Sequence, residues 1–180
     1  MIRRFALALA TVALAGTGTT GCSTVTSARN AATVDGHHLS VKRFEALLAG
    51  LAQAPDAFGI PPVGATGMPG KTARSILGQW ISNTVMANAL AKKGVTVSVA
   101  DRKAAEDKIA SGNAATIWAT FSPDMRAFVI DAQTLQPAFQ QAFGTEASKA
   151  LSNAASVAKI NVDSHDGMWD AATGQVVATR

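Results

Sequence analysis

The longest helical pattern in the chain covers residues 71–93 and constrains the fold more than any other segment. Apolar and small side chains recur there at three- and four-residue spacing, which is typical of an amphipathic helix with one buried face. Lys92 and Lys93 followed by Gly94 mark the end of this helix, because cations and then glycine suit a helix carboxyl terminus. The pattern predicts a long helix whose apolar face contributes to a core.

Further helices are predicted on both sides of this segment. Residues 41–53 form an amphipathic pattern capped by Ser40, and residues 99–110 form a charged pattern capped by Ser98, which we expect at the periphery of the fold. Ser122 and Pro123 begin another helix, which Pro137 is expected to kink or divide and Gly144 to end. Residues 113–121 predict a turn or short helix, and residues 145–155 one more short helix.

Extended segments lie at both ends of this helical region. Asp35-Gly36 between two short arms is a strong hairpin signal, because both residues tolerate a positive φ. Residues 157–162 alternate apolar and polar side chains and predict a strand, and the tail around Trp169 contains turn residues and a possible extended piece. Two distant short strands are not stable alone in water, so we expect them to pair. The predicted fold is mainly α, with short N- and C-terminal β-strands that pair with each other.

The amino terminus has the pattern of an export signal. Arg3 and Arg4 precede the uncharged apolar run of residues 5–16, which is too short for a membrane span. Small residues then lead to Cys22, so we expect residues 1–21 to be a signal peptide and Cys22 to be lipidated. Lipoprotein signals usually carry an aliphatic residue where this chain has Thr19, and an ordinary secretory signal that leaves Cys22 as a free thiol is the alternative.

The rest of the chain is expected to be a flexible tether over residues 22–31 and a single domain over residues 32–180. Cys22 is the only cysteine, so no intramolecular disulfide and no thiolate metal cluster can form. The formal net charge is +4, and it falls to +2 once Arg3 and Arg4 leave with the signal. That small excess does not indicate nucleic-acid binding. We therefore expect an exported protein held by lipid on the extracytoplasmic face of the cell membrane.

A long segment rich in proline and glycine interrupts the helical region. Residues 54–70 hold four prolines and four glycines, which excludes regular structure and predicts a surface loop. Loops of this length are usually functional or disordered, and this one carries Phe58, Ile60, Val63 and Met68. These side chains either form a sticky surface or fold back onto the helices.

Three motifs in this order resemble the N-terminal chaperone domain of SurA-type proteins, a module also found around the isomerase domain of PrsA-type foldases. The first is Val34-Asp35-Gly36 followed by Leu39-Ser40 and the helix with Phe44; the second is AKKGVTVS at residues 91–98; the third is INVDSHDGMWD at residues 160–170. The resemblance covers most of the mature chain and implies a helical chaperone domain. Asp35 stands where the family usually has Asn, and Ser164-His165-Asp166 departs from the family's usual Pro-Arg-Tyr.

The resemblance does not extend to the family's parvulin isomerase domain. SurA- and PrsA-type proteins insert roughly 90 residues between the helical part and the returning strand, whereas here Ala155 runs on to Val157 with no insertion. His37 and His38 lie in the predicted hairpin and His165 in the tail, so no histidine is left for such a site. A peptidyl-prolyl isomerase is therefore the less favoured interpretation.

The chain carries no catalytic or metal-binding pattern that supports an enzyme. The chain has no His-Glu-x-x-His, no phosphate-binding glycine loop and no Gly-x-Ser-x-Gly elbow. Asp163, His165, Asp166 and Asp170 are the only group of metal-capable side chains close in sequence, and they lack the ligand spacing of an EF-hand. We expect a polar turn there, no cofactor and no catalysis.

Binding of unfolded or newly exported polypeptides through apolar surface is the expected function. Such a holdase shields extended segments by burying apolar side chains and needs no catalytic group. Five residues are candidates for the client-binding groove: Phe58, Ile60, Met68, Trp118 and Met125. The alternative is an accessory lipoprotein with the same domain and one dedicated envelope partner.

Overall fold

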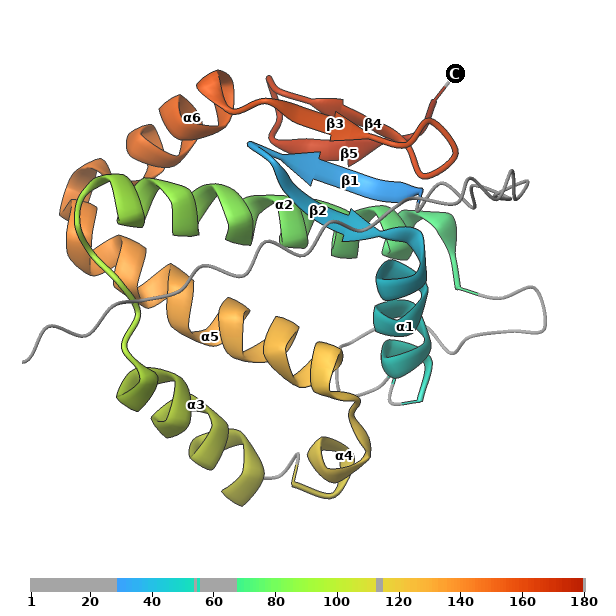
Figure 1. Ribbon diagram of the computed structural model, residues 1–180, viewed down its shortest axis with the longest axis vertical. Helices are drawn as coiled ribbons and strands as arrows, with labels where there is room; N and C mark the ends of the chain where they lie inside the picture. The colour runs from blue at the N-terminus through green and yellow to red at the C-terminus, as the bar shows by residue number, and fades with distance from the viewer. Residues whose placement is uncertain (1–28, 54, 56–67, 113–114, 180) are drawn as a thin grey trace, which may run out of the picture.

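The computed structural model describes residues 29–53, 55, 68–112 and 115–179. Within them the protein is mainly helical, as predicted, with short strands near both ends of the described chain (Figure 1). In chain order the elements are β1 (Asn30–Val34), β2 (His37–Ser40), α1 (Val41–Ala52), α2 (Gly70–Lys92), α3 (Val99–Ser111), α4 (Ala115–Thr120), α5 (Pro123–Phe143), the 3-10 turn η2 (Gly144–Glu146), α6 (Ala147–Val157), β3 (Ile160–Val162), β4 (Met168–Asp170) and β5 (Gln175–Val177). No helix in the described residues has the length and apolarity needed to cross a bilayer.

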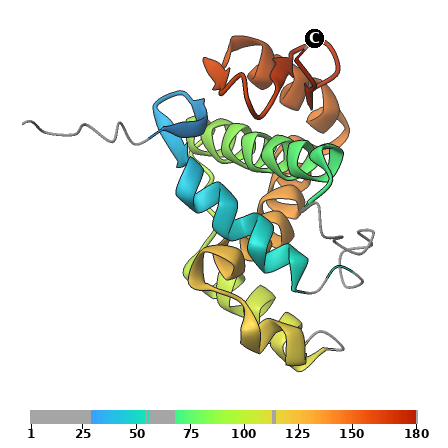
Figure 2. The same ribbon diagram turned by 90° about the vertical axis from the view of Figure 1, so that its right-hand side faces the viewer.

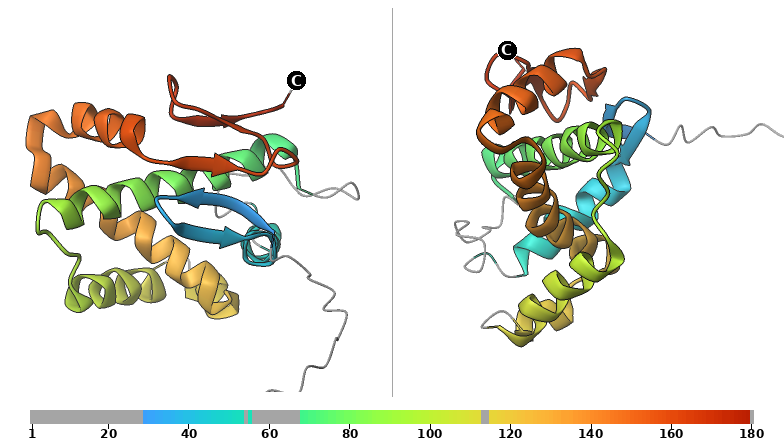
Figure 3. Two further views of the ribbon diagram at one scale, coloured as in Figure 1. Left: turned by 45° about the horizontal axis from the view of Figure 1, so that its top comes forward. Right: turned by 90° about the vertical axis from the view of Figure 1, so that its left-hand side faces the viewer.

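The predicted hairpin and the pairing of the two ends are both confirmed. Asp35 and Gly36 form the turn with φ values of 48° and 87°, the positive values that a tight hairpin requires. The sheet order is β2-β1-β3, with β3 antiparallel to β1 and Val34 opposite Ile160 (Figure 3, left). Asp35 also fixes this junction, since its Oδ1 accepts a hydrogen bond of 2.8 Å from the backbone N–H of Lys159.

Side-chain caps begin three of the helices at the serines identified in the sequence. Ser40 accepts from the N–H of Arg43 at 3.2 Å, and Ser122 accepts from Met125 at 3.2 Å. Ser98 and Asp101 form a reciprocal capping box, which satisfies two backbone donors at the start of α3. These local hydrogen bonds explain why the starts of α1, α3 and α5 are predictable from the sequence.

Several predicted boundaries were wrong. β1 begins at Asn30, so the folded domain starts two residues before the predicted boundary at residue 32. The predicted strand over residues 157–162 is shorter, because α6 continues through Val157 and β3 begins only at Ile160. The predicted helix over residues 145–155 is split into η2 and α6. Pro137 does not divide α5, which runs as one helix from Pro123 to Phe143.

The layers of the molecule are organised around α2. β1 and the β4–β5 hairpin cover one side of α2, α5 packs on its other side, and α3 lies beyond α5 (Figure 1). Figure 2 shows the sheet and the C-terminal hairpin at one end of the molecule and α3 and α4 at the other. The main core includes Leu39, Leu47, Leu77, Ile81 and Met125, and a smaller core joins the end of α2 to α5 and α6.

The charged helix α3 has the peripheral position that its sequence predicts. None of its described residues is buried, and Ile109 is its one side chain that is partly buried against the main core. Its attachment includes an ion pair of 2.6 Å between Arg102 Nη1 and Asp131 Oδ1 on α5. Because α3 stands off from the core in this way, an open space is left between α3 and α5.

Candidate functional site

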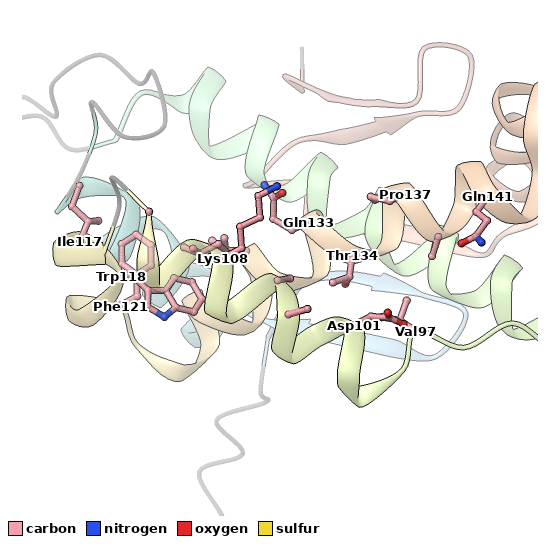
Figure 4. A pocket seen from close by; sticks show the side chains of 16 residues that line it. Val97, Asp101, Lys108, Ile117, Trp118, Phe121, Gln133, Thr134, Pro137 and Gln141 are labelled. Atoms are coloured by element: carbon pink, nitrogen blue, oxygen red, sulfur yellow. The ribbon is translucent and has the colours of Figure 1, made fainter.

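A concave site with a volume of about 740 Å³ lies between α3, α4 and α5. We call it the α3–α5 groove (Figure 4). Its walls are mostly apolar or small side chains, with a few polar groups. It is lined by Val97, Asp101, Ala104, Ala105, Lys108, Ile109, Gly112, Ile117, Trp118, Phe121, Val129, Gln133, Thr134, Pro137, Ala138 and Gln141.

Helix α3 forms one wall of the groove with small side chains. Ala104 and Ala105 leave room that larger residues would fill, and Lys108 and Ile109 follow one turn later on the same face. The Arg102–Asp131 ion pair holds this wall against α5. Both side chains of that pair are more than one third exposed, so the pair positions α3 without contributing much stability.

Aromatic side chains form one end of the groove. Figure 4 shows Ile117, Trp118 and Phe121 gathered at this end, away from Gln141. The rings of Trp118 and Phe121 lie edge to face, with centroids 6.0 Å apart and planes at 70°. The guanidinium of Arg126 lies 5.5 Å from the Trp118 ring centroid and donates to the carbonyl of Ala119 at 3.1 Å. These contacts fix the orientation of the aromatic end.

Helix α5 provides the opposite side of the groove. Val129 and Ala138 are partly buried there, whereas Gln133, Pro137 and Gln141 are exposed along the rim. The buried hydroxyl of Thr134 donates to the carbonyl of Ile130 at 2.8 Å, so its hydrogen-bonding capacity is used within its own helix. The groove therefore has an apolar lining and an amide-bearing rim.

Of the five residues predicted to bind clients, the three that the structure describes do not line one surface. Trp118 lines the groove and is only 5% exposed. Met125 is fully buried in the main core beneath Gly50, and Met68 is partly buried against the same core, so neither lines the groove. Phe58, Ile60 and the lipidation candidate Cys22 lie outside the described residues.

Most of the groove residues were missed in the sequence. The only signal for the α3 wall is a face of small residues, Ala104 and Ala105 followed by Ile109, inside a helix that otherwise looks fully solvated. Phe121 and Val129 look like ordinary core positions, because their pattern does not show that a groove opens beside them. The groove depends on how far α3 stands from α5, which is a tertiary property.

A polar cluster at the opposite end of the molecule contains the tail residues considered for metal binding. Arg29 donates to Asp163 Oδ2 at 2.9 Å, and the backbone and ring nitrogens of His165 both lie 3.0 Å from Asp163 Oδ1. The backbone N–H of His165, together with Arg29, lowers the pKa of Asp163 from 3.8 to about 2. No group of three or more metal-capable side chains in the described residues is placed to hold an ion. The cluster ties the start of β1 to the loop after β3.

The histidines of the first hairpin are exposed. His37 and His38 lie on β2 with their side chains open to solvent, and Asn30 Nδ2 is 3.4 Å from His38 Nδ1. A second, smaller concavity of about 290 Å³ lies between α2 and α6, with Val157 exposed at its edge. This concavity is smaller than the α3–α5 groove, and Asp35 is the one acidic side chain in its described lining. It is therefore a weaker candidate for a binding site than the α3–α5 groove.

Comparison of the chain with protein-family models, with curated proteins and with solved structures found no match. The resemblance to SurA-type chaperone domains therefore stays a prediction that rests on the order of the sequence motifs.

Proposed function

We propose that this protein is an exported lipoprotein that binds unfolded, newly exported polypeptides without catalysing a reaction on them. The α3–α5 groove is the observation that carries the proposal. Its lining is mostly apolar, and its volume of about 740 Å³ lies in the range of common ligand sites. Burial of apolar side chains is non-directional, so such a groove suits segments of varied sequence.

The position of the groove also supports an anchored holdase. Arg29, the first described residue, precedes β1 at the sheet end of the molecule, and α3 and α4 lie at the other end (Figures 1 and 2). These two helices line the groove. A lipid on Cys22 would therefore tether the domain from its sheet end, with the groove at the far end of the domain.

The experiment uses the chain from Ser23 onward, which contains every described element and both cores. It is mixed at stoichiometric amounts with two unrelated unfolding clients, and light scattering reports aggregation. We expect suppression by the wild type and a clear loss with Ala104→Glu, because a carboxylate on the groove wall opposes burial of apolar segments. Proline isomerisation measured on the same samples should not be accelerated.

The matched control is Ala110→Glu, which places the same charge at an exposed position of the same helix outside the groove lining. Suppression should survive this change. If the wild type fails to suppress aggregation of either client, the general holdase is excluded, and a single dedicated envelope partner becomes the function to test.

A further inference from the structure

Three of the six charged side chains of α3 are held in ion pairs and a fourth in the capping box, whereas Glu106 and Lys108 have no oppositely charged group of the described residues within 4.0 Å. Arg102 pairs with Asp131 at 2.6 Å, and Lys103 pairs with Asp107 at 3.0 Å. Asp101, the one acidic residue lining the groove, accepts from both the backbone N–H and the hydroxyl of Ser98 in the capping box. Its charge is thereby used to begin the helix.

Lys108 is the exception among the charges of the groove. It lines the groove, and no carboxylate of the described residues lies within 4.0 Å of its ammonium group. It stands seven residues after Asp101, about 10 Å further along the helix axis. Its neighbours in the lining include Ile109, Trp118 and Phe121, so the described lining of the groove has one uncompensated cation beside an apolar surface.

This arrangement favours a segment that carries a negative charge next to apolar side chains. An apolar wall lowers the local dielectric constant, so a charge pair formed against it is screened less than one in open solvent. A segment with a cation at the same point would face Lys108 without a partner. The apolar contacts supply the affinity, and Lys108 supplies a difference in affinity between segments.

Building on the proposed function, we propose that the α3–α5 groove selects unfolded segments in which an aspartate, a glutamate or a terminal carboxylate adjoins apolar residues. The carboxylate pairs with the ammonium of Lys108 while the neighbouring side chains are buried against the aromatic end of the groove. Segments of equal apolarity that carry lysine at that position bind more weakly.

The test compares two fluorescent peptides that are identical except for one position, glutamate in one and lysine in the other, beside the same apolar residues. Their affinities for the chain from Ser23 are measured by fluorescence anisotropy at low and high salt. We expect the glutamate peptide to bind about fivefold more tightly at low salt, and this preference to shrink as salt screens the pair.

Variants of the protein identify the residue responsible. Lys108→Glu should reverse the preference, and Lys108→Gln should abolish it while leaving apolar binding in place. The matched control is Lys149→Glu on α6, an exposed position outside the groove, which should leave the preference unchanged. Circular dichroism checks that each variant is folded.

The outcomes separate this inference from the proposed function. Equal binding of the two peptides, or a preference that Lys108→Glu does not alter, overturns the selection by Lys108. The proposed function still stands in that case if both peptides bind and the wild type suppresses client aggregation. If neither peptide binds, both proposals fail. If the fatty acid laurate binds and the peptides do not, the occupant is an anionic amphiphile and the polypeptide proposal is overturned.

Discussion

Gly167 directly precedes β4 and Gly174 ends the turn between β4 and β5; both have a positive φ, but their surroundings differ. At Gly167, where φ is 140°, an added Cβ would lie 2.6 Å from the carbonyl oxygen of Val177 and 2.7 Å from a methyl group of Val176. At Gly174, where φ is 65°, it would have no heavy atom of the described residues within 4 Å. Only backbone strain opposes a side chain at Gly174, whereas strain and collision both oppose one at Gly167.

We predict that Gly167→Ala lowers the free energy of unfolding by about 2 kcal/mol or more, and Gly174→Ala by about 1 kcal/mol. Urea denaturation followed by tryptophan fluorescence measures both, since Trp169 lies in the hairpin. Equal losses for the two variants would mean that the close approach at Gly167 does not determine the stability of the hairpin.

Asp163 makes the stability of the fold depend on pH. Because its pKa is lowered from 3.8 to about 2, its stabilising contribution is present above pH 4 and is lost as the pH falls toward 2. We predict that Asp163→Asn is less stable than the wild type at pH 7 and that the difference disappears near pH 2. Urea midpoints measured between these pH values check this. A difference that is constant with pH would contradict the role of the charged carboxylate.

Residues that act through their own backbone or through a near neighbour could be predicted from the sequence. Asp35-Gly36 and the capping serines Ser40, Ser98 and Ser122 belong to this class, because their hydrogen bonds reach no further than a few residues. Met125 belongs to a second class, the residues whose surroundings depend on contacts with segments distant in the sequence. Nothing in the sequence distinguishes a methionine beneath Gly50 in the core from one in a groove.

At the scale of elements, the long periodic segments were predicted closely, whereas the bounds of several short elements were not. α2 and α5 follow their apolar patterns to within a residue or two, whereas β4 has three residues and no pattern of its own. The boundary between α6 and β3 also escaped prediction, because Val157 fits both a helix end and a strand start. Pairing with β1 decides where the strand begins.

Helix α3 should be the least stable of the longer helices, since none of its described residues is buried. We predict that its amides exchange with deuterium faster than those of α2, and that Arg102→Ala increases this exchange by removing the ion pair with Asp131. Lys103→Ala removes only the pair with Asp107 inside α3 and serves as the control. Protection of α3 equal to that of α2 would contradict a loosely attached groove wall.

At the scale of the whole molecule, the mainly helical class and the closure of the two ends were predicted, but the groove was not. The mainly helical fold class follows from local sequence patterns. The pairing of the N- and C-terminal strands follows because isolated strands need partners. The groove arises where three helices leave space, and that space depends on the small residues Ala104 and Ala105 and on the distance that the Arg102–Asp131 pair allows. Among the predicted client-binding positions that the structure describes, Trp118 is the one that lines the groove.

The membrane attachment of the full chain depends on Cys22. We predict that the full chain expressed in a bacterium incorporates radioactive palmitate and fractionates with membranes, and that Cys22→Ser removes the label. A wild-type chain that is exported but unlabelled, with a free thiol or cut elsewhere, would instead indicate an ordinary secretory signal.

The decisive measurement locates a bound client on the molecule. The chain from Ser23 contains no cysteine, so Ala104→Cys and Ala110→Cys each introduce a single site for a photo-crosslinker on the same helix, one inside the groove and one outside it. The proposed function predicts that an unfolded client crosslinks to position 104 and not to position 110. Crosslinking of equal strength at both positions, or none at position 104, would show that clients do not bind in the α3–α5 groove.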